Sequence, residues 1–487
     1  MLRGAIASVI GTTPAPTTLV EAAPGAVAAH TKAVLTTAAE GTVPKGVPPA
    51  PAGLPLLQWV DKYEFATLGA PAPADMPPGP PNLSQEQWAA KWVYAQQQAA
   101  EQAAQNAAAG AAAAAPAPGT GPGQDSLTMR SLASYDSLAV CNDGTPGAFY
   151  YSPGTDPTTW VVFLQGGMWC WDAESCSQRA LNGPGQVSSA SWPAVMTMGG
   201  LFDTDPSLNP FAGANKVYLA YCSSDAWLGD VSEEATQASH GFSWAFRGRR
   251  ILRATLDVLV SDLGLGGGTA SASKPHRLLL AGCSAGARGA MLNLDAVREA
   301  APVGVQVQGL LDSPEWIDVQ PLLPTIVSLG DQCASALSLF NASGTLNPQC
   351  VAAQPANSSY LCLMGQYAML YLSTPYFLNA AQFDAFQIPY NVGGMPSLSN
   401  AAEMTYCNNW QDTLLSAINP LPTASQPNSG VFSLSCLRHC LTQGPAFWSA
   451  RILNESLATA AGTWFYNNGG SAKYFGNCQT YPRCVMC

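Results

Sequence analysis

One pentapeptide restricts the fold of this chain more than any other feature of its sequence. Gly282-Cys-Ser-Ala-Gly286 follows an apolar run, 277–281, and precedes a helix-favouring segment, 285–300. This G-x-S-x-G pattern is typical of a sharp strand-to-helix turn, because its glycines permit the tight backbone that exposes the serine hydroxyl. The pattern predicts that Ser284 lies at the carboxyl end of a buried strand, at the N-terminus of a helix.

Further apolar runs have the length of buried strands, and helix-favouring segments separate them. Such alternation is typical of a mainly parallel sheet with helices on its faces. We therefore expect an α/β-hydrolase-like fold, with a mainly parallel sheet flanked by helices and a largely disordered N-terminal leader. The predicted strands are 160–164, 216–220, 277–281 and 305–311, and the predicted helices are 246–263 and 285–300.

The composition of the chain changes near residue 126. All fourteen cysteines lie between Cys141 and Cys487, whereas residues 1–82 are rich in Pro and Ala and carry few charges. Such a segment has little apolar surface to bury, so we predict that it is a disordered leader. Residues 83–125 favour an Ala/Gln-rich helix followed by a linker. The hydrolase domain is expected to span 126–487, with a Cys-rich C-terminal end.

The charge balance and the length of the apolar runs argue against a nucleic-acid partner and against a membrane segment. Lys and Arg total 20 against 31 Asp and Glu, which gives a formal net charge of −11, and no basic cluster is long enough to neutralise several phosphates. We therefore expect no nucleic-acid partner. No stretch approaches the ~20 strongly apolar residues of a transmembrane helix, so no integral membrane segment is expected either.

The cysteines and sequons indicate an oxidising compartment. An even number of cysteines confined to the globular part is typical of disulfide-bonded, exported proteins. The apolar run near the N-terminus, 5–10, is shorter than the core of an ordinary signal peptide, so the export route stays open. We expect a secreted or cell-wall location. The four Asn-x-Ser sequons begin at Asn82, Asn341, Asn357 and Asn454.

A serine hydroxyl needs a general base, and the chain has four histidines. His30 lies in the predicted leader, and His276 begins the strand that ends at Ser284, roughly 25 Å away. His240 precedes the nucleophile, whereas this fold places its triad in the order Ser, acid, His. His439, in a late, loop-like segment, is therefore the predicted base.

Two aspartates between the nucleophile and the base follow apolar runs. Asp312 directly ends the strand 305–311, and Asp384 follows the run 376–378. A carboxylate at either place could accept the imidazole N–H and stabilise the imidazolium. We place Asp312 first and keep Asp384 as the alternative acid.

Backbone N–H groups for a developing oxyanion are predicted on two segments. Ala285, the residue after the nucleophile, supplies one of them. The loop that begins at Gly166 and Gly167, after the strand 160–164, supplies the other, because paired glycines let the backbone approach a substrate closely. Trp169 in the same loop could line the substrate pocket or belong to the core.

These segments resemble the pectin acetylesterase and Notum carboxylesterase family over roughly residues 136–445. Seven blocks match the family in the right order. They are Cys141-Asn-Asp-Gly-Thr-Pro, Gly166-Gly-Met-Trp-Cys170 with Cys176, Tyr221-Cys-Ser-Ser-Asp-Ala-Trp227, Phe246-Arg-Gly-Arg-Arg-Ile251, Gly282-Cys-Ser-Ala-Gly286, Leu311-Asp-Ser313 and Cys436-Leu-Arg-His439.

The resemblance implies a serine carboxylic ester hydrolase that uses no cofactor and no metal. Its substrate would be an acylated carbohydrate such as pectin, from which it removes an acyl group, acetyl foremost. A Notum-like protein O-deacylase acting on a longer acyl chain is the alternative, and a catalytically silent binding or scaffold relative is another. The family positions correspond here to a triad of Ser284, Asp312 and His439 and to oxyanion groups at Gly167, Met168 and Ala285.

Cysteines flank both the nucleophile and the base. Triad geometry brings the Ser and His side chains within ~3 Å, so Cys283 and Cys440 could reach the ~6 Å Cα separation of a disulfide. A thiol nucleophile at Cys283 is the competing hypothesis, which we disfavour because the turn points Ser284 into the cleft. Cys170 and Cys176 are expected to form a local loop. The resemblance suggests Cys141–Cys222 and Cys350–Cys362, and Cys478, Cys484 and Cys487 are expected to form a disulfide knot rather than a metal site.

Overall fold

The computed structural model describes residues 123–267, 275–397, 399–423 and 426–477. The predicted leader 1–82, almost all of the predicted helix and linker 83–125, and the cysteines predicted to form a C-terminal knot lie outside the described residues.

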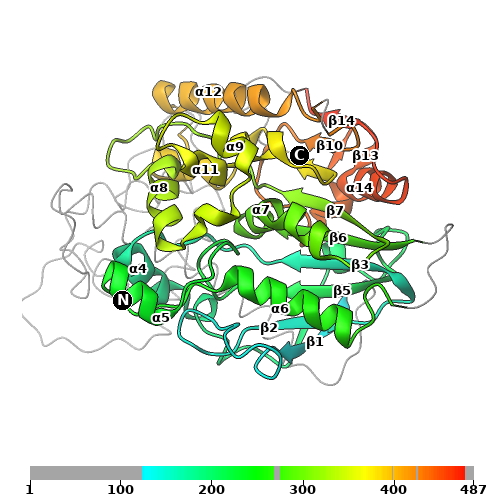
Figure 1. The fold of residues 1–487 in the computed structure, drawn as a ribbon. Coiled ribbons are helices and arrows are strands. Elements are labelled where there is room, and N and C mark those ends of the chain that lie inside the picture. Colours follow the sequence, from blue (N-terminus) through cyan, green and yellow to red (C-terminus); the bar gives the residue numbers. More distant parts are fainter. Residues whose placement is uncertain (1–122, 268–274, 398, 424–425, 478–487) are drawn as a thin grey trace, which may run out of the picture. The chain divides into compact units, whose positions relative to one another are not determined.

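A ten-stranded sheet forms the centre of the described domain (Figure 1). The strand order is β14-β10-β8-β7-β6-β3-β5-β2-β1-β4, and every neighbouring pair from β14 to β5 is parallel. The pairs from β5 to β4 are antiparallel. The expected fold, a mainly parallel sheet flanked by helices, is thus confirmed. The strands are β1 Asp125–Ser131, β2 Ala148–Ser152, β3 Asp156–Leu164, β4 Val195–Met198, β5 Ala214–Leu219, β6 His276–Cys283, β7 Val305–Asp312, β8 Tyr376–Asn379, β10 Gly430–Ser433 and β14 Ala472–Phe475.

Helices cover the sheet, and short strand pairs lie outside it. The helix α7 packs along β3, β6 and β7, whereas α14 packs on β8 and β10. The helices are α4 Ala173–Asn182, α5 Glu233–His240, α6 Gly248–Ser261, α7 Ala285–Ala300, α8 Leu329–Leu339, α9 Pro348–Ala353, α10 Gly365–Ala368, α11 Gln387–Val392, α12 Ala401–Ile418, α13 Ala446–Ser449 and α14 Leu457–Tyr466. The additional strand pairs are β9 Phe383–Asp384 with β11 Leu437–Arg438, and β12 Arg451–Ile452 with β13 Glu455–Ser456.

The central strands are apolar along their whole length because both faces of the sheet are covered. Val161, Phe163, Leu279 and Ala281 alternate along β3 and β6, and they share one buried cluster with Trp464 of α14. The residues between them point to the opposite face and are also buried. A parallel sheet covered on both faces requires such continuous apolar runs, which explains why these strands could be recognised in the sequence.

Each strand and helix predicted beyond residue 126 is present in the structure. The helix 285–300 has the predicted bounds, and α6 is shorter than the predicted 246–263. The antiparallel strands β1, β2 and β4 were not predicted. They carry mixed polar and apolar residues, because an edge of the sheet that is partly exposed does not need a continuous apolar run.

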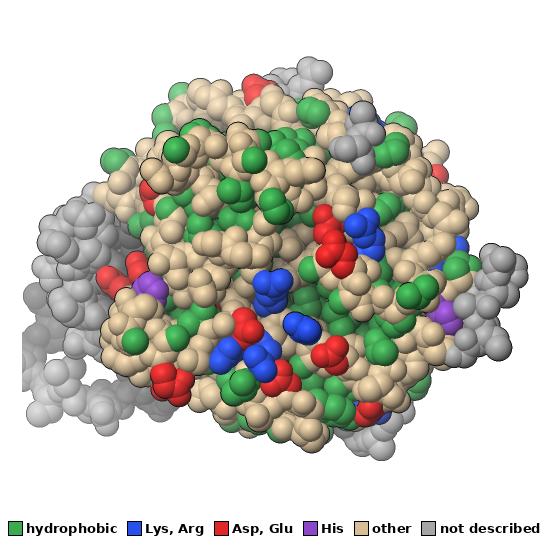
Figure 2. All heavy atoms as spheres, viewed as in Figure 1, with side chains coloured by type: hydrophobic (Ala, Val, Ile, Leu, Met, Phe, Trp, Pro, Cys, Tyr) green, Lys and Arg blue, Asp and Glu red, His purple; other side chains and the backbone are tan. Residues whose placement is uncertain are grey.

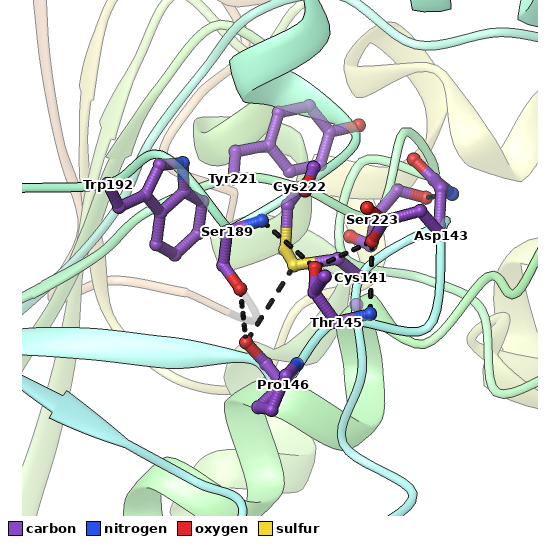
Figure 3. The surroundings of a disulfide bond; sticks show 12 residues. Cys141, Asp143, Thr145, Pro146, Ser189, Trp192, Tyr221, Cys222 and Ser223 are labelled. Atoms are coloured by element: carbon purple, nitrogen blue, oxygen red, sulfur yellow. Dashed lines mark hydrogen bonds between the residues drawn. A yellow bond between two sulfur atoms is a disulfide. The ribbon is translucent and has the colours of Figure 1, made fainter.

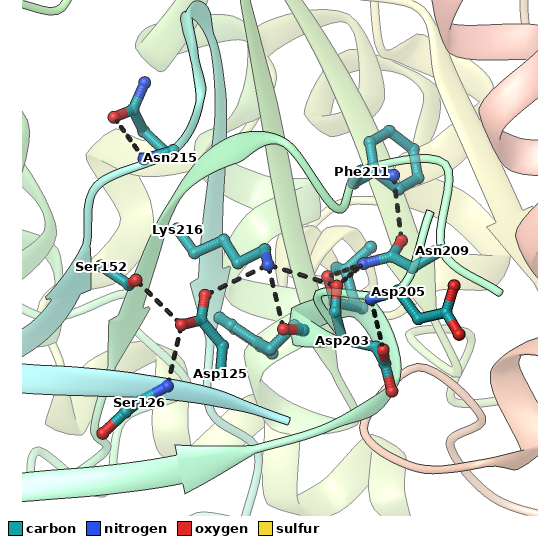
Figure 4. A network of polar contacts seen from close by, with 12 residues as sticks. Asp125, Ser126, Ser152, Asp203, Asp205, Asn209, Phe211, Asn215 and Lys216 are labelled. Carbon is teal, nitrogen blue, oxygen red and sulfur yellow. Dashed lines mark hydrogen bonds and ion pairs between the residues drawn. The ribbon is translucent and has the colours of Figure 1, made fainter. Parts of the chain in front are cut away.

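A buried lysine fixes the antiparallel part of the sheet (Figure 4). The Nζ of Lys216 donates to Oδ2 of Asp125 at 3.1 Å and to the carbonyl oxygens of Phe202 and Asp203 at 3.0 and 3.2 Å. Burial lowers the pKa of Lys216, while the charge of Asp125 acts to raise it. Three acceptors satisfy the three ammonium protons, so this lysine has a structural role.

Much of the surface in view carries no charge, and one cluster of opposite charges lies near α6 (Figure 2). The ion pairs near the start of α6 join Arg247 to Asp230 and Arg250 to Asp136 and Asp230. Exposed pairs of this kind contribute little to stability. Among the described residues, no helix combines the length and the apolar character needed to cross a membrane.

Candidate active site

Ser284 occupies the turn between β6 and α7. Its φ of 57° lies in the left-handed region, which is strained for a residue with a side chain and is found most often at functional sites. Its N–H donates to the carbonyl oxygen of Asp312 at 2.9 Å, which ties the turn to the end of β7. The serine is thereby fixed at the carboxyl edge of the parallel strands, at the N-terminus of α7.

Close backbone packing makes this turn possible. A Cβ atom on Gly286 would lie 2.0 Å from the carbonyl oxygen of Leu164, and one on Gly166 would lie 2.4 Å from the carbonyl oxygen of Cys283. The same Cβ on Gly166 would be 3.1 Å from the Cβ of Ser284. Only glycine allows backbones to approach so closely. The loop after β3 therefore lies directly against the nucleophile turn.

A disulfide joins the nucleophile turn to the loop that carries His439. Cys283 and Cys440 are bonded across a sequence separation of 157 residues, with a Cα–Cα distance of 5.6 Å. Because consecutive Cα atoms are ~3.8 Å apart, the Cα atoms of Ser284 and His439 are separated by at most about 13 Å. Closing so long a loop contributes about 2–5 kcal/mol to stability. The bond also leaves Cys283 without a free thiol, which excludes it as the nucleophile.

Asp384 holds the imidazole. Its Oδ2 lies 2.7 Å from Nδ1 of His439, and its Oδ1 accepts hydrogen bonds from the N–H groups of Phe386 and Gln387 at 2.8 and 2.7 Å. The parallel pairing of β9 with β11 places Asp384 opposite Arg438, so His439, the residue after β11, meets the carboxylate. With Nδ1 engaged, Nε2 is the ring nitrogen that remains for proton transfer.

The placement of Asp312 at the imidazole is corrected by these contacts. The Oδ2 of Asp312 accepts hydrogen bonds from the N–H groups of Leu441 and Thr442 at 2.7 and 2.8 Å and from the Thr442 hydroxyl at 2.6 Å. Its Oδ1 accepts hydrogen bonds from Asn379 Nδ2 at 2.6 Å and from the Ser313 hydroxyl at 3.4 Å. The fully buried carboxylate thus anchors the backbone that follows His439, and its bonding capacity is used there.

Two opposing effects act on the pKa of His439. Burial lowers it, whereas the charge of Asp384 and the hydrogen bond to Asp384 raise it, and the charge of Asp312 adds to the increase. The net result is a pKa above the ordinary value for histidine. The imidazolium form is therefore stabilised, as a general base requires.

Arg179 on α4 fixes the peptide that follows Gly167. Its Nη1 donates to the carbonyl oxygen of Gly167 at 2.6 Å, and its Nε donates to Ser224 Oγ at 2.7 Å. The guanidinium also lies over the ring of Tyr221, with Cζ 5.2 Å from the centroid. Because the C=O and N–H of a trans peptide point in opposite directions, this contact fixes the direction of the Met168 N–H. A donor held in this way needs no reorganisation when charge develops.

The disulfide between Cys141 and Cys222 supports this region (Figure 3). Cys222 follows Tyr221, whose ring lies beneath Arg179, and a hydrogen bond of 2.7 Å from Ser189 Oγ to the carbonyl oxygen of Pro146 braces the Cys141 side. The structure also contains the other two disulfides proposed from spacing and resemblance, Cys170–Cys176 and Cys350–Cys362.

Trp169 and Met168 are neighbours in the same loop, but their side chains have different environments. Trp169 is buried, its Nε1 donates to Gln332 Oε1 at 3.0 Å, and its ring meets that of Trp316 edge-to-face at a centroid distance of 4.8 Å. Met168 is exposed and has a φ of 62°. Trp169 is therefore part of a buried aromatic wall in the loop 165–170 after β3, which we call the oxyanion loop after its expected role.

A third buried carboxyl group, Glu315, lies near the two aspartates. Burial raises its pKa well above the ordinary value, and the charges of Asp384 and Asp312 raise it further. No residue in the described part of the chain donates to or accepts from its Oε1. Neither Glu315 nor Arg179 could be recognised in the sequence, because neither belongs to a motif with a chemical meaning of its own.

The fold and the site define a class. A serine at a left-handed strand-to-helix turn, joined by a disulfide to the loop of a His–Asp pair, fits the arrangement of α/β-hydrolase-like carboxylic ester hydrolases. The family model for pectinacetylesterase matches residues 123–487. The chain therefore belongs to the pectinacetylesterase family, and the family expected from the sequence is confirmed.

Known proteins from animals and plants are similar to this chain. Palmitoleoyl-protein carboxylesterase NOTUM of Drosophila melanogaster is 30% identical over 350 residues, which are 70% of this chain and 49% of that protein. The match thus spans about half the length of that relative. Pectin acetylesterase 11 of Arabidopsis thaliana is 27% identical over 351 residues, 67% of this chain and 84% of that protein. A solved structure of the Wnt deacylase Notum from Drosophila superposes with a TM-score of 0.66 at 27% identity, covering 74% of this chain and 100% of that chain.

Proposed function

We propose that this protein is an active serine esterase that removes an acyl group, acetyl foremost, from a carbohydrate such as pectin. One observation supports the proposal above all. The turn that carries Ser284 is linked through the Cys283–Cys440 disulfide to the loop of His439, whose Nδ1 lies 2.7 Å from Asp384. A binding module needs neither a strained serine turn nor an oriented imidazole beside it.

In the proposed reaction, Nε2 of His439 takes the proton of the Ser284 hydroxyl as the oxygen attacks the ester carbonyl. Asp384 stabilises the imidazolium that forms. The N–H groups of Met168 and Ala285 donate to the tetrahedral oxyanion, with Gly167 as the further expected donor. The alcohol leaves with the proton from the imidazolium, and a water activated by the same imidazole hydrolyses the acyl-serine.

The pH dependence follows from the pKa of His439. Only the neutral imidazole can accept the serine proton, so kcat/KM is expected to fall as the pH drops through that pKa. Because Asp384 raises the pKa, the acid limb should lie above the ordinary imidazole value of about 6.5. A pH profile of p-nitrophenyl acetate hydrolysis measures this midpoint. A midpoint below that ordinary value would contradict the assigned His–Asp pair.

The carbohydrate substrate and the location are supported by different observations. The family model and the plant relative carry the name of an enzyme acting on acetylated pectin. Four disulfides join described residues, which suits an oxidising compartment and therefore a secreted or cell-wall protein. Three of the sequon asparagines, Asn341, Asn357 and Asn454, are exposed, whereas Asn82 lies outside the described residues.

The experiment is acetate release from acetylated pectin by the purified protein, with and without prior treatment with a fluorophosphonate. We expect acetate release that the reagent abolishes, together with a covalent mass increase on the peptide that contains Ser284. Acetate release without labelling, or full activity after complete labelling, would refute the serine mechanism. A protein that neither releases acetate nor becomes labelled would favour the binding or scaffold alternative.

The second candidate is a protein O-deacylase, which the 30% identity to the Drosophila carboxylesterase favours. A synthetic peptide that carries a palmitoleoyl ester on serine separates the two activities. Faster hydrolysis of this peptide than of acetylated carbohydrate would move the assignment to the deacylase.

A further inference from the structure

A second group on α7 lies beside the nucleophile and has no part in the proposed reaction. Arg288 follows Ser284 by four residues, and its N–H donates to the Ser284 carbonyl oxygen at 2.9 Å. Arg288 therefore lies in the first turn of α7, whose N-cap is the nucleophile Ser284. Arginine is rarely buried, yet this one is 0% exposed.

Aromatic rings from two loops, those that follow β3 and β7, enclose the guanidinium. Its Cζ lies 3.5 Å from the ring centroid of Trp316 and 4.1 Å from that of Trp169. Trp169 comes from the oxyanion loop, and Trp316 comes from the loop after Asp312. The two rings meet at 88°, so the guanidinium fills the corner between them. The space between these two loops, beside the first turn of α7, is therefore filled by the guanidinium.

Polar contacts hold the side chain in this corner. Nε and Nη2 donate to the carbonyl oxygen of Leu363 at 3.3 and 3.0 Å, and Nη2 lies 3.9 Å from the Sγ of Cys333. Burial lowers the pKa of Arg288 to about 10, so the group stays charged at neutral pH. The two indole faces compensate part of the lost hydration. Nη1 has no partner in the described part of the chain.

The direction of the acyl group follows from the chemistry. The leaving oxygen must come within hydrogen-bonding reach of His439, so the alcohol lies on the side of the imidazole. The imidazole contacts Phe386 and Asp384, which belong to neither the oxyanion loop nor α7. The oxyanion points at the N–H groups of Met168 and Ala285, so the acyl substituent of the tetrahedral carbon takes the remaining direction away from His439, which the proposal assigns to the wall formed by Trp169, Trp316 and Arg288.

We infer that Arg288 limits the length of the acyl group, so that the site accepts acetyl and other short acyl groups and excludes long ones. This inference rests on the proposed esterase activity and goes beyond it by naming the residue that sets the limit. A longer chain would have to displace a guanidinium that is held by two rings and a carbonyl oxygen, and its methylenes would otherwise stay in water. Arg288 is thus a specificity-determining residue and takes no part in proton transfer.

The test compares kcat/KM for p-nitrophenyl octanoate with kcat/KM for p-nitrophenyl acetate in the wild type and in Arg288→Ala. The octanoate-to-acetate ratio is expected to rise at least about tenfold, since each newly buried methylene contributes about fourfold. A general loss of activity cancels in this ratio. Arg298→Ala, on the exposed end of the same helix, is the matched control and should keep the wild-type ratio.

Arg288→Leu is the second variant, in case the alanine protein does not fold. Leucine keeps an apolar contact with both rings but is shorter and uncharged, so the ratio is expected to rise at least about threefold. An unchanged ratio in a folded variant that still hydrolyses the acetate ester would overturn the inference and leave the esterase proposal intact. Loss of both activities in the wild type with no fluorophosphonate labelling would be a failure of the proposed function itself.

Discussion

Replacing Ser284 with alanine is expected to lower kcat for p-nitrophenyl acetate by about 10⁶-fold, to the residual level that binding and oxyanion donors provide. The physical reason is that no other hydroxyl lies at the strained turn against which Gly166 packs. The fold should persist, because the substitution removes one oxygen from a side chain at the edge of the sheet. Circular dichroism and thermal unfolding check this.

Ser313 provides a matched control for that variant. It also follows a central strand and has a left-handed φ of 61°, but its hydroxyl accepts from the N–H of Cys440 at 3.2 Å. Ser313→Ala should therefore lower kcat for p-nitrophenyl acetate by about tenfold or less, the equivalent of one neutral hydrogen bond. Equal activities of the two variants would remove Ser284 from the role of nucleophile.

The second large effect is expected for Asp384→Asn. The amide keeps the shape of the carboxylate but presents a donor or a neutral acceptor to Nδ1, which disturbs the tautomer and no longer stabilises the imidazolium. We expect kcat to fall about 10⁴-fold. Because the charge of Asp384 is what raises the pKa of His439, the acid limb of any residual activity should also move to lower pH.

Asp312→Asn is the comparison that separates the two aspartates. Here the expected loss is in the free energy of unfolding, about 2–3 kcal/mol, because a buried acceptor of five hydrogen bonds is replaced by a group that also donates. Urea unfolding measures this loss, and the activity of the folded fraction should fall less than in Asp384→Asn. The reverse pattern, with catalysis lost at Asp312 and retained at Asp384, would restore Asp312 as the orienting acid.

Much of the fold could be predicted because it depends on neighbours in the sequence. The turn of 282–286 needs glycines at fixed places, and α7 has the predicted bounds because its helix-favouring residues form one continuous segment. The central strands are covered on both faces and therefore appear as apolar runs. The antiparallel strand β4 has alternating exposed and half-buried residues, and no such run marks it.

The acid of the site could not be chosen from the sequence. Asp312 and Asp384 both end strands and both lie between Ser284 and His439, so the local sequence does not show which of them contacts the imidazole. The register of β9 against β11, between segments more than fifty residues apart, places Asp384 on the imidazole and leaves Asp312 to the backbone of Leu441 and Thr442.

The sequence by itself determined the α/β fold, the strand-to-helix turn of Ser284 and the choice of His439 as the candidate base, because each of these depends on the order and spacing of residues along the chain. Only the tertiary structure decided which carboxylate meets that histidine, how Arg179 fixes the oxyanion loop and that Arg288 fills the corner between Trp169 and Trp316. The physical reason is that these contacts join distant segments, and their partners are set by strand register and side-chain packing, which no local pattern encodes.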